Sequence, residues 1–277
     1  MAEGSTIRDS VCLDCTPDPG TRGLGEADVI VWSYGGGTQS AAIAVMILTG
    51  ELPCPDIAVM ADTSRECSET RQYLKLIVQP TLDTIGLTVQ IVSHEYAYWD
   101  IVKEKNNSVL IPAFTRQSGN IGKLPTFCSN EWKRRPIQRW LKEQGVNNCD
   151  VWLGISTDEA ERMKISDLKW YRHIYPLIEM VPTSRHQCRA KVLQYGWPEP
   201  PKSRCWMCPN MSPQSWKQLK SKWNSDFIQA VLLEYEIQKT DPTIYLHPLA
   251  IPLRDAVEQS EQQSDMFDGC DSGYCWT

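Results

Sequence analysis

Short apolar runs alternate with helical patterns over the first 155 residues, and this alternation most constrains the fold. The runs are rich in Val and Ile, as buried strands are, and they cover residues 28–33, 56–61, 87–92 and 149–154. Helical patterns separate them at 38–49, at 64–85 with an interruption near Pro80, and at 136–144. Strands that alternate with helices form parallel sheets with right-handed crossovers. We therefore predict a three-layer, Rossmann-like α/β domain built on a parallel sheet.

A glycine-rich loop, residues 33–40, follows the first predicted strand. Glycines let the backbone approach an anion without a side-chain collision, and the start of the next helix presents free N–H groups and a positive dipole end. The loop has neither the Gly-Lys-Ser/Thr ending of a Walker loop nor the GxGxxG pattern. It either makes a tight connection or binds phosphate. We predict phosphate binding by Ser33, Gly35, Gly36, Gly37, Thr38, Gln39 and Ser40.

Composition indicates a folded protein without a membrane segment. The chain has 277 residues, 42% of them hydrophobic, and its 28 Lys and Arg against 34 Asp and Glu give a net charge of −6. The longest unbroken apolar run, residues 41–48, is too short to span a bilayer, and the first residues lack the pattern of a secretory signal. We therefore expect a cytoplasmic protein with no membrane partner. The acidic balance argues against a broad non-specific grip on nucleic acid but not against a local basic groove.

The strand and helix pattern weakens after about residue 155, and this suggests four parts. We expect an N-terminal extension over 1–27, a nucleotide-binding α/β domain over 28–160, a cysteine-bearing helical segment over 161–238 and a C-terminal tail over 239–277. Within the third part, residues 216–238 have the pattern of one helix.

The cysteines point to metal or redox chemistry. There are 11 of them, an odd number, and two pairs have CxxC spacing, so structural disulfides are a poor interpretation. The pair in Cys205-Trp-Met-Cys208-Pro209 is common to iron–sulfur ligands, zinc knuckles and thiol redox pairs. Four thiols suffice for a 4Fe-4S cluster or a tetrahedral zinc. The candidates are Cys128, Cys188, Cys205 and Cys208, whereas Cys54, Cys67 and Cys149 are expected to be packed thiols.

Two further features have alternative interpretations. Cysteines near both ends of the chain, Cys12, Cys15, Cys270 and Cys275, form a second possible zinc site. A basic run beside Cys128 neutralises either thiolates or a bound anion, or it is a solvated helix face. This run consists of Lys133, Arg134, Arg135 and Arg139.

The glycine loop resembles the modified pyrophosphate-binding loop of the adenine nucleotide alpha-hydrolase-like superfamily, Ser-Gly-Gly-x-Asp-Ser. Gly36, Gly37 and Ser40 match that pattern, Gly35 replaces the first Ser, and Gln39 replaces the Asp. The ATP pyrophosphatase branch normally keeps this Asp, whereas the phosphoadenosine phosphosulfate reductase branch often does not. The resemblance therefore favours the reductase branch.

Two later motifs support the same branch. Asp62-Thr63 with Glu69-Thr70 and Tyr73 is similar to that family's Asp-Thr-Gly and Glu-Thr-x-x-Phe/Tyr stretch, and residues 154–162 are similar to its Gly-Ile-Arg-x-Asp-Glu segment with a later Arg. Ser156 stands where Arg is common. Ligands of open parallel sheets lie at the carboxyl ends of the strands, so Asp62, Thr63, Gly154 and Arg162 are expected near the nucleotide. The alternatives are a helix cap at Asp62, and for Arg162 a salt bridge to Asp158 or Glu159.

This resemblance implies nucleotide-dependent sulfur chemistry in a cluster-bearing branch, similar to phage-encoded or DNA-sulfur-modification relatives. It implies an adenine nucleotide, ATP or a sulfonucleotide, as ligand and a thiol reductant such as a thioredoxin-like protein as partner. In the branch that uses adenylyl sulfate, a Cys-Cys pair and a later CxxC hold a 4Fe-4S cluster. Here Cys128 matches one member of the pair and Phe127 replaces the other, so Cys188 is the candidate fourth ligand. Family reductases also attack the sulfate sulfur with a C-terminal cysteine, for which Cys270 and Cys275 are the candidates.

Two other functions remain open. One is an ATP-dependent sulfurtransferase that thiolates a nucleic acid, of the DNA phosphorothioation or tRNA thiolation type, against which Gln39 counts. The other is a non-catalytic nucleotide-binding protein, suggested by the departures from the family pattern at Gly35, Gln39 and Ser156.

Overall fold

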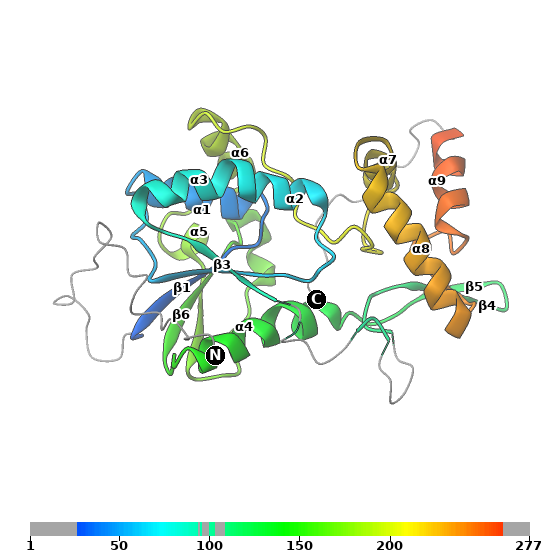
Figure 1. Cartoon of the computed structure of the whole chain (residues 1–277), viewed down its shortest axis with the longest axis horizontal. Helices are drawn as coiled ribbons and strands as arrows, with labels where there is room; N and C mark the ends of the chain where they lie inside the picture. The colour runs from blue at the N-terminus through cyan, green and yellow to red at the C-terminus, as the bar shows by residue number, and fades with distance from the viewer. Residues whose placement is uncertain (1–26, 94, 96–99, 103–108, 263–277) are drawn as a thin grey trace, which may run out of the picture. The chain divides into compact units, whose positions relative to one another are not determined.

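The computed structural model describes residues 27–93, 95, 100–102 and 109–262, and these form two compact units (Figure 1). Unit 1 comprises Met1–Asp62, Glu69–Tyr96 and Pro136–Ser203. Unit 2 comprises Thr63–Ser68, Ala97–Arg135 and Arg204–Thr277. Each unit is therefore assembled from segments that are distant in the sequence. The four-part division expected from the sequence stays a prediction.

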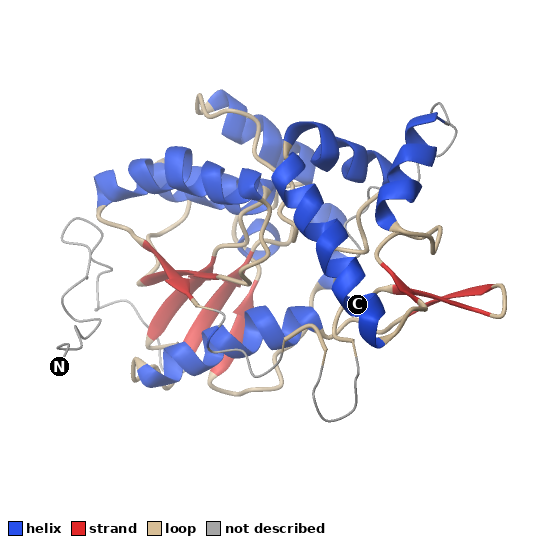
Figure 2. Ribbon diagram, turned by 45° about the vertical axis from the view of Figure 1, so that its right-hand side comes forward, coloured by secondary structure: helices blue, strands red, loops and turns tan. Residues whose placement is uncertain are grey.

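Unit 1 contains a five-stranded parallel sheet in the order β3-β2-β1-β6-β7 (Figure 2). Its strands are β1 (Val29–Ser33), β2 (Ile57–Ala61), β3 (Val89–Val92), β6 (Cys149–Leu153) and β7 (Tyr171–Ile174). The predicted α/β class and the four predicted strands are confirmed. The fifth strand, β7, lies in the region where the sequence pattern weakens, because only one of its four residues is fully buried.

Helices cover both faces of this sheet. Successive residues of β1 point to opposite faces, so Trp32 packs in the cluster that includes α1 (Thr38–Leu48), whereas Val31 packs with Ile137 of α4 (Arg135–Glu143). The α1 face also carries α5 (Pro176–Glu179) and α6 (Arg185–Gln194), which contact α1. Because α1 is buried on nearly every side, its sequence is almost continuously apolar. A 3-10 helix covers Thr157–Arg162.

The helix predicted over 64–85 is shorter and more irregular than expected. It begins at α2 (Ser68–Tyr73), because Ser64 has a φ of 56° that a helix does not allow. A π-helical turn (Leu74–Val78) follows, then α3 (Gln79–Leu82) and a 3-10 turn (Asp83–Ile85). The wide turn directly precedes Pro80, which has no N–H to donate to the preceding turn.

Unit 2 combines helices with a small antiparallel sheet in the order β5-β4-β8. Its elements are β4 (Phe114–Gln117), β5 (Asn120–Lys123), a π-helical turn (Asn130–Arg134), α7 (Pro213–Lys222), α8 (Asn224–Thr240), β8 (Ile244–Tyr245) and α9 (Leu253–Gln262). The single helix predicted over 216–238 is wrong, because Trp223 has φ −132° and ψ 54° and separates α7 from α8. No helix in the described part of the chain is both long and apolar enough to cross a membrane.

Candidate functional site

The glycine loop of unit 1 leaves no room for side chains. Gly36 has a φ of +76°, and a Cβ there would lie 2.4 Å from Cγ2 of Thr70 on α2. At Gly37 a Cβ would lie 3.3 Å from Cβ of Ser203. The Gly35 N–H donates to Oγ of Ser40 (2.8 Å), which fixes the loop against the first turn of α1. The loop is therefore tightly held, and it needs glycine at its centre.

The N-terminus of α1 lacks a cap of its own. Gly37 is the N-cap residue and supplies no side-chain hydrogen bond, and the first turn contains no acidic residue. The first N–H groups of a helix have no partner within the helix, and a positive dipole end attracts anions. This end of α1 is thus suited to a negatively charged group.

Buried polar groups without partners lie beside the loop. Thr70 is fully buried, and its hydroxyl has no hydrogen-bond partner among the described residues. The phenol of Tyr34 and the indole N–H of Trp32 are also buried, and neither has a hydrogen-bond partner among the described residues. Burial strongly raises the pKa of Tyr34, so its hydroxyl stays protonated. An unmade hydrogen bond of a buried group costs about 1–3 kcal/mol, so these groups suit a ligand or ordered water.

The glycine loop meets the third sequence motif inside unit 1. Nε2 of Gln39 donates to Oε2 of Glu159 (3.0 Å), and Nη1 of Arg162 lies 2.8 Å from the same oxygen. A Cβ on Gly154 would lie 3.3 Å from Cβ of Gln39. An Asp at position 39 would face the Glu159 carboxylate, whereas Gln39 donates to it. The guanidinium of Arg162 is engaged by Glu159, so its predicted role in holding an anion stays a prediction.

Asp62 and Thr63 follow β2 but belong to different units. The Asp62 side chain lies 3.5 Å from Arg71 and is one third exposed, and its N–H donates to Val92 of β3. Thr63 is buried in unit 2, where its Oγ1 lies 3.7 Å from Sγ of Cys205. Thr63 therefore contacts a predicted metal ligand, while its predicted contact with nucleotide stays a prediction.

Three of the predicted thiols lie in unit 2 against one apolar core. Cys128, Cys205 and Cys208 are partly buried and pack on the cluster that includes Trp132 and Trp216. The Cys208 N–H donates to the Cys205 carbonyl (3.1 Å), so the CxxC forms a tight turn. Such a turn brings both cysteines to one side of the chain, as a chelating pair requires.

A buried ion pair stands beside these thiols. Nζ of Lys133 lies 2.8 Å from Oε1 of Glu66, whose side chain is 2% exposed. Burial favours the neutral amine, but Glu66 and Cys205 together raise the pKa of Lys133, so it remains a cation. Cys128 acts on it in the same direction. The sequence singled out Lys133 within a basic run but gave no signal for Glu66, which reaches Lys133 only through the folding of unit 2.

The surroundings of Cys205 favour a ligand over a reactive thiol. Burial raises its pKa to about 12, Glu66 adds to this, and Lys133 opposes it. Reactive redox cysteines have lowered pKa values, whereas a metal ion displaces the proton of a coordinating thiol. The donor set of Cys128, Cys205 and Cys208 fits a thiophilic metal or cluster in type. Among the described residues, no three His, Cys, Asp or Glu side chains are already arranged as metal ligands.

Cys188 has a different environment from the other predicted ligands. It lies on α6, is fully buried in the apolar core of unit 1, and has a pKa raised to about 12 by burial. Its assignment as a fourth ligand stays a prediction that this packing does not support. Cys67 and Cys149 are buried thiols as well, and Cys54 is partly exposed. Cys12, Cys15, Cys270 and Cys275 lie outside the described residues.

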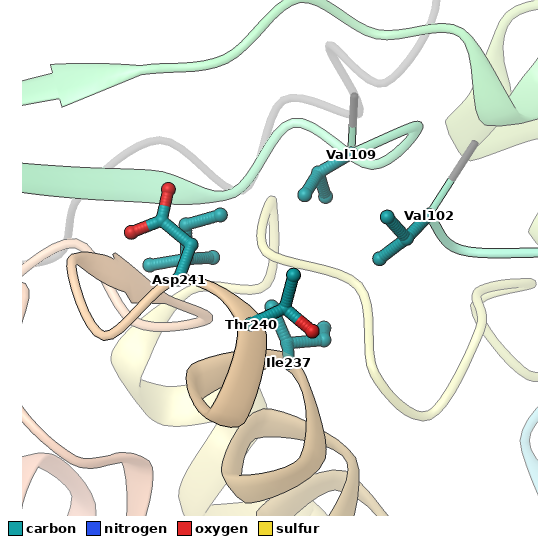
Figure 3. A pocket seen from close by; sticks show the side chains of 6 residues that line it. Val102, Val109, Ile237, Thr240 and Asp241 are labelled. Carbon is teal, nitrogen blue, oxygen red and sulfur yellow. The ribbon is translucent and has the colours of Figure 1, made fainter. Parts of the chain in front are cut away.

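A small pocket of about 210 Å³ in unit 2 lacks the chemistry of a reaction site (Figure 3). Val102, Val109, Ile237 and Ile244 give it apolar walls. The one carboxylate on its lining, Asp241, accepts hydrogen bonds from the N–H (2.9 Å) and Oγ1 (2.6 Å) of Thr243.

Searches against family models and against curated proteins find no match. Two solved structures are similar to this chain. One is the phosphoadenylyl-sulfate reductase from Candida auris in a phosphate complex, with 16% identity and a TM-score of 0.40 over 62% of this chain and 74% of that one. The other is the U34-tRNA thiolase NcsA from Methanococcus maripaludis with its 4Fe-4S cluster, with 14% identity and a TM-score of 0.43 over 96% of this chain and 78% of that one. At these identities the likeness concerns the fold alone.

Proposed function

We propose that this chain is an enzyme of nucleotide-dependent sulfur chemistry. It binds an adenine nucleotide at the glycine loop of unit 1 and handles sulfur with the thiols of unit 2. The observation that carries the proposal is the ion pair of Lys133 with the buried Glu66 (2.8 Å), because Glu66 pairs with Cys205 of the CxxC in an antiparallel bridge. A cation beside thiols stabilises the negative charge that thiolates or a sulfur anion bring into an apolar core.

The nucleotide is held mainly by backbone groups. The N–H groups of residues 36–40 at the N-terminus of α1 meet the phosphates, and the Thr70 hydroxyl adds a donor. Glu159 holds Gln39 in place through the 3.0 Å hydrogen bond, with Arg162 behind it. Arg162 is then a positioning residue for the loop, and Asp62 and Gly154 border the nucleotide.

Cys128, Cys205 and Cys208 hold a 4Fe-4S cluster, or zinc as the alternative. Such a group supplies a Lewis-acidic metal that binds and polarises sulfur. Lys133 offsets the negative charge of the three thiolates, and Glu66 fixes the direction of the Lys133 ammonium. Ser203, which lies against Gly37, precedes Cys205 by two residues in the sequence.

In the reductase form of the proposal, a thiol attacks the sulfur of a sulfonucleotide and the nucleotide leaves. A second thiol then releases sulfite, and the two thiols become a disulfide that a thioredoxin-like dithiol reduces. Cys270 and Cys275 are the candidates for the attacking thiol. In the thiolation form, ATP adenylates an oxygen of a nucleic acid with loss of pyrophosphate, and a sulfide-level nucleophile displaces AMP. The exposed cations Arg116 and Lys123 on the β4–β5 hairpin of unit 2 favour this second form.

Anaerobic purification followed by analysis of iron, acid-labile sulfide and zinc tests the metal assignment. We expect metal in the wild type and in Cys54→Ser, a partly exposed control, and its loss in Cys205→Ser. Sulfite release from sulfonucleotides and pyrophosphate release from ATP with nucleic acid then separate the two forms. Tight nucleotide binding without either product would leave a non-catalytic binding protein, and a metal-free wild type would refute the ligand set.

A further inference from the structure

The β4–β5 ribbon of unit 2 is exposed along its whole outer part. The strands pair in antiparallel register from Phe114↔Lys123 to Gln117↔Asn120, joined through Ser118 and Gly119. Every residue from 116 to 123 is exposed, and Figure 2 shows the hairpin reaching out beyond the end of α8. The third strand, β8, pairs only with Phe114 and Thr115, so the outer part of the ribbon has two strands, and two-stranded ribbons are marginally stable by themselves. A ribbon left open on both faces therefore suits a binding partner.

The two faces of this ribbon differ in chemistry. Side chains of directly paired residues lie on one face, as do those two residues apart, so Phe114, Arg116, Ile121 and Lys123 share a face. Nζ of Lys123 lies 5.3 Å from the centroid of the Phe114 ring. The other face carries Thr115, Gln117, Asn120 and Gly122. One face thus combines two cations with apolar groups, and the other is uncharged.

The basic face is unusual for this chain. The whole sequence has a net charge of −6, yet it contains no Asp or Glu between Glu104 and Glu131. Within the described residues, neither the Arg116 nor the Lys123 side chain takes part in an ion pair. Both cations are therefore presented to solvent with no carboxylate beside them in the ribbon, which marks this surface for an anionic partner.

We propose that the Phe114, Arg116, Ile121 and Lys123 face of the β4–β5 ribbon binds the sugar–phosphate backbone of a nucleic acid. Arg and Lys contact phosphates, while aromatic and apolar side chains pack on sugars and bases. A two-stranded ribbon is narrow enough to follow a strand or enter a groove. This binding does not depend on the proposed function. Only the further step, that the bound nucleic acid is the substrate of thiolation, rests on the proposed sulfur chemistry.

Fluorescence anisotropy with labelled 20-nucleotide single-stranded RNA, single-stranded DNA and duplex DNA tests this surface on the full chain. Arg116→Gln with Lys123→Gln should weaken binding of the best probe by about tenfold or more and lower the slope of log K against log salt by about 2. Lys75→Gln with Lys222→Gln removes the same charge from two exposed lysines elsewhere and should change affinity by less than about twofold. Circular dichroism checks that both variants are folded.

Equal effects in the two double variants, or no binding of any probe by the wild type, would overturn the proposal. Loss of self-association in the ribbon variant, with nucleic-acid binding unchanged, would overturn it in favour of pairing between copies through β5. Metal content and ATP or sulfonucleotide turnover are measured on the same samples. If turnover is absent while the ribbon variant still weakens nucleic-acid binding, the proposed sulfur chemistry fails and this inference stands. If sulfite is released while the ribbon variant binds nucleic acid as the wild type does, this inference fails and the sulfur chemistry stands.

Discussion

The two units build their candidate sites from different materials. Unit 1 offers glycine backbone, a helix N-terminus and uncharged hydroxyls, with Thr70 packed against Gly36. Unit 2 offers thiols and an ion pair with a buried carboxylate: Lys133 contacts Glu66, which pairs with Cys205. A site made of closely packed backbone is sensitive to added volume, whereas a site made of buried charge is sensitive to the removal of one partner. Added volume in unit 1 and removal of one charge in unit 2 are therefore the substitutions to which each site should respond most strongly.

The largest effect is expected from removing the cation of unit 2. In Lys133→Met, the Glu66 carboxylate stays buried without its cation, and such a loss costs about 4 kcal/mol of the free energy of unfolding. Glu66→Gln should cost less, because the Lys133 side chain is 26% exposed and retains access to water. Urea denaturation of samples with matched metal content measures both values.

The double variant supplies the control for this pair. Glu66→Gln with Lys133→Met removes both charges, so it should recover most of the stability lost in Lys133→Met. If the stability losses of the two single variants simply added in the double variant, the two side chains would act independently. Unit 2 would then not depend on a buried charge pair, and this difference from unit 1 would be wrong.

The next effect concerns volume in unit 1. Gly36→Ala combines a positive φ with a Cβ placed 2.4 Å from Cγ2 of Thr70, so it should cost about 3 kcal/mol and abolish nucleotide binding. Gly50→Ala is the matched control, since Gly50 has a φ of +75° and no atom within 4 Å of its Cβ position. It should cost about 1 kcal/mol from backbone strain alone. Equal melting temperatures for the two variants would contradict the close approach of Thr70.

A charge placed inside the packed site of unit 1 should have an intermediate effect. Gln39→Glu replaces a donor 3.0 Å from Glu159 with a second carboxylate, and the lost hydrogen bond and the repulsion should cost about 2 kcal/mol at neutral pH. Adding Glu159→Gln exchanges the two groups and should restore most of the stability. If Gln39→Glu alone were as stable as the wild type at pH 7, the contact between residue 39 and Glu159 would be refuted.

How far the sequence predicts each unit follows from how each is assembled. In unit 1 the strand and helix periods are local, so β1, β2, β3, β6, α1 and α4 were predicted within a residue or two. Both units join three separate segments, but the site of unit 2 depends on contacts between its segments: the approach of Glu66 to Lys133 and Cys205 leaves no local pattern. Cys188 illustrates the same limit: a thiol inside a polar helical stretch gives no sign that it faces the core of unit 1.

The smallest effect separates a ligand-binding hydroxyl from a structural one, because it should change stability and affinity in opposite directions. Thr70→Val keeps the side-chain shape and removes a buried hydroxyl that has no partner among the described residues, so the free energy of unfolding should rise by about 1 kcal/mol. If the hydroxyl serves the nucleotide, affinity should fall about tenfold, since hydrogen bonds to charged groups contribute about 1.5–3 kcal/mol. Thr183→Val is the control: that hydroxyl donates to the Val181 carbonyl (2.6 Å), so its loss should destabilise unit 1 and leave affinity unchanged. Thermal unfolding and calorimetric titration with ATP and adenylyl sulfate measure both quantities. Unchanged affinity in Thr70→Val would mean that the glycine-loop site holds the nucleotide with backbone groups. The candidate site of unit 1 would then use no side chain, whereas that of unit 2 consists of side chains.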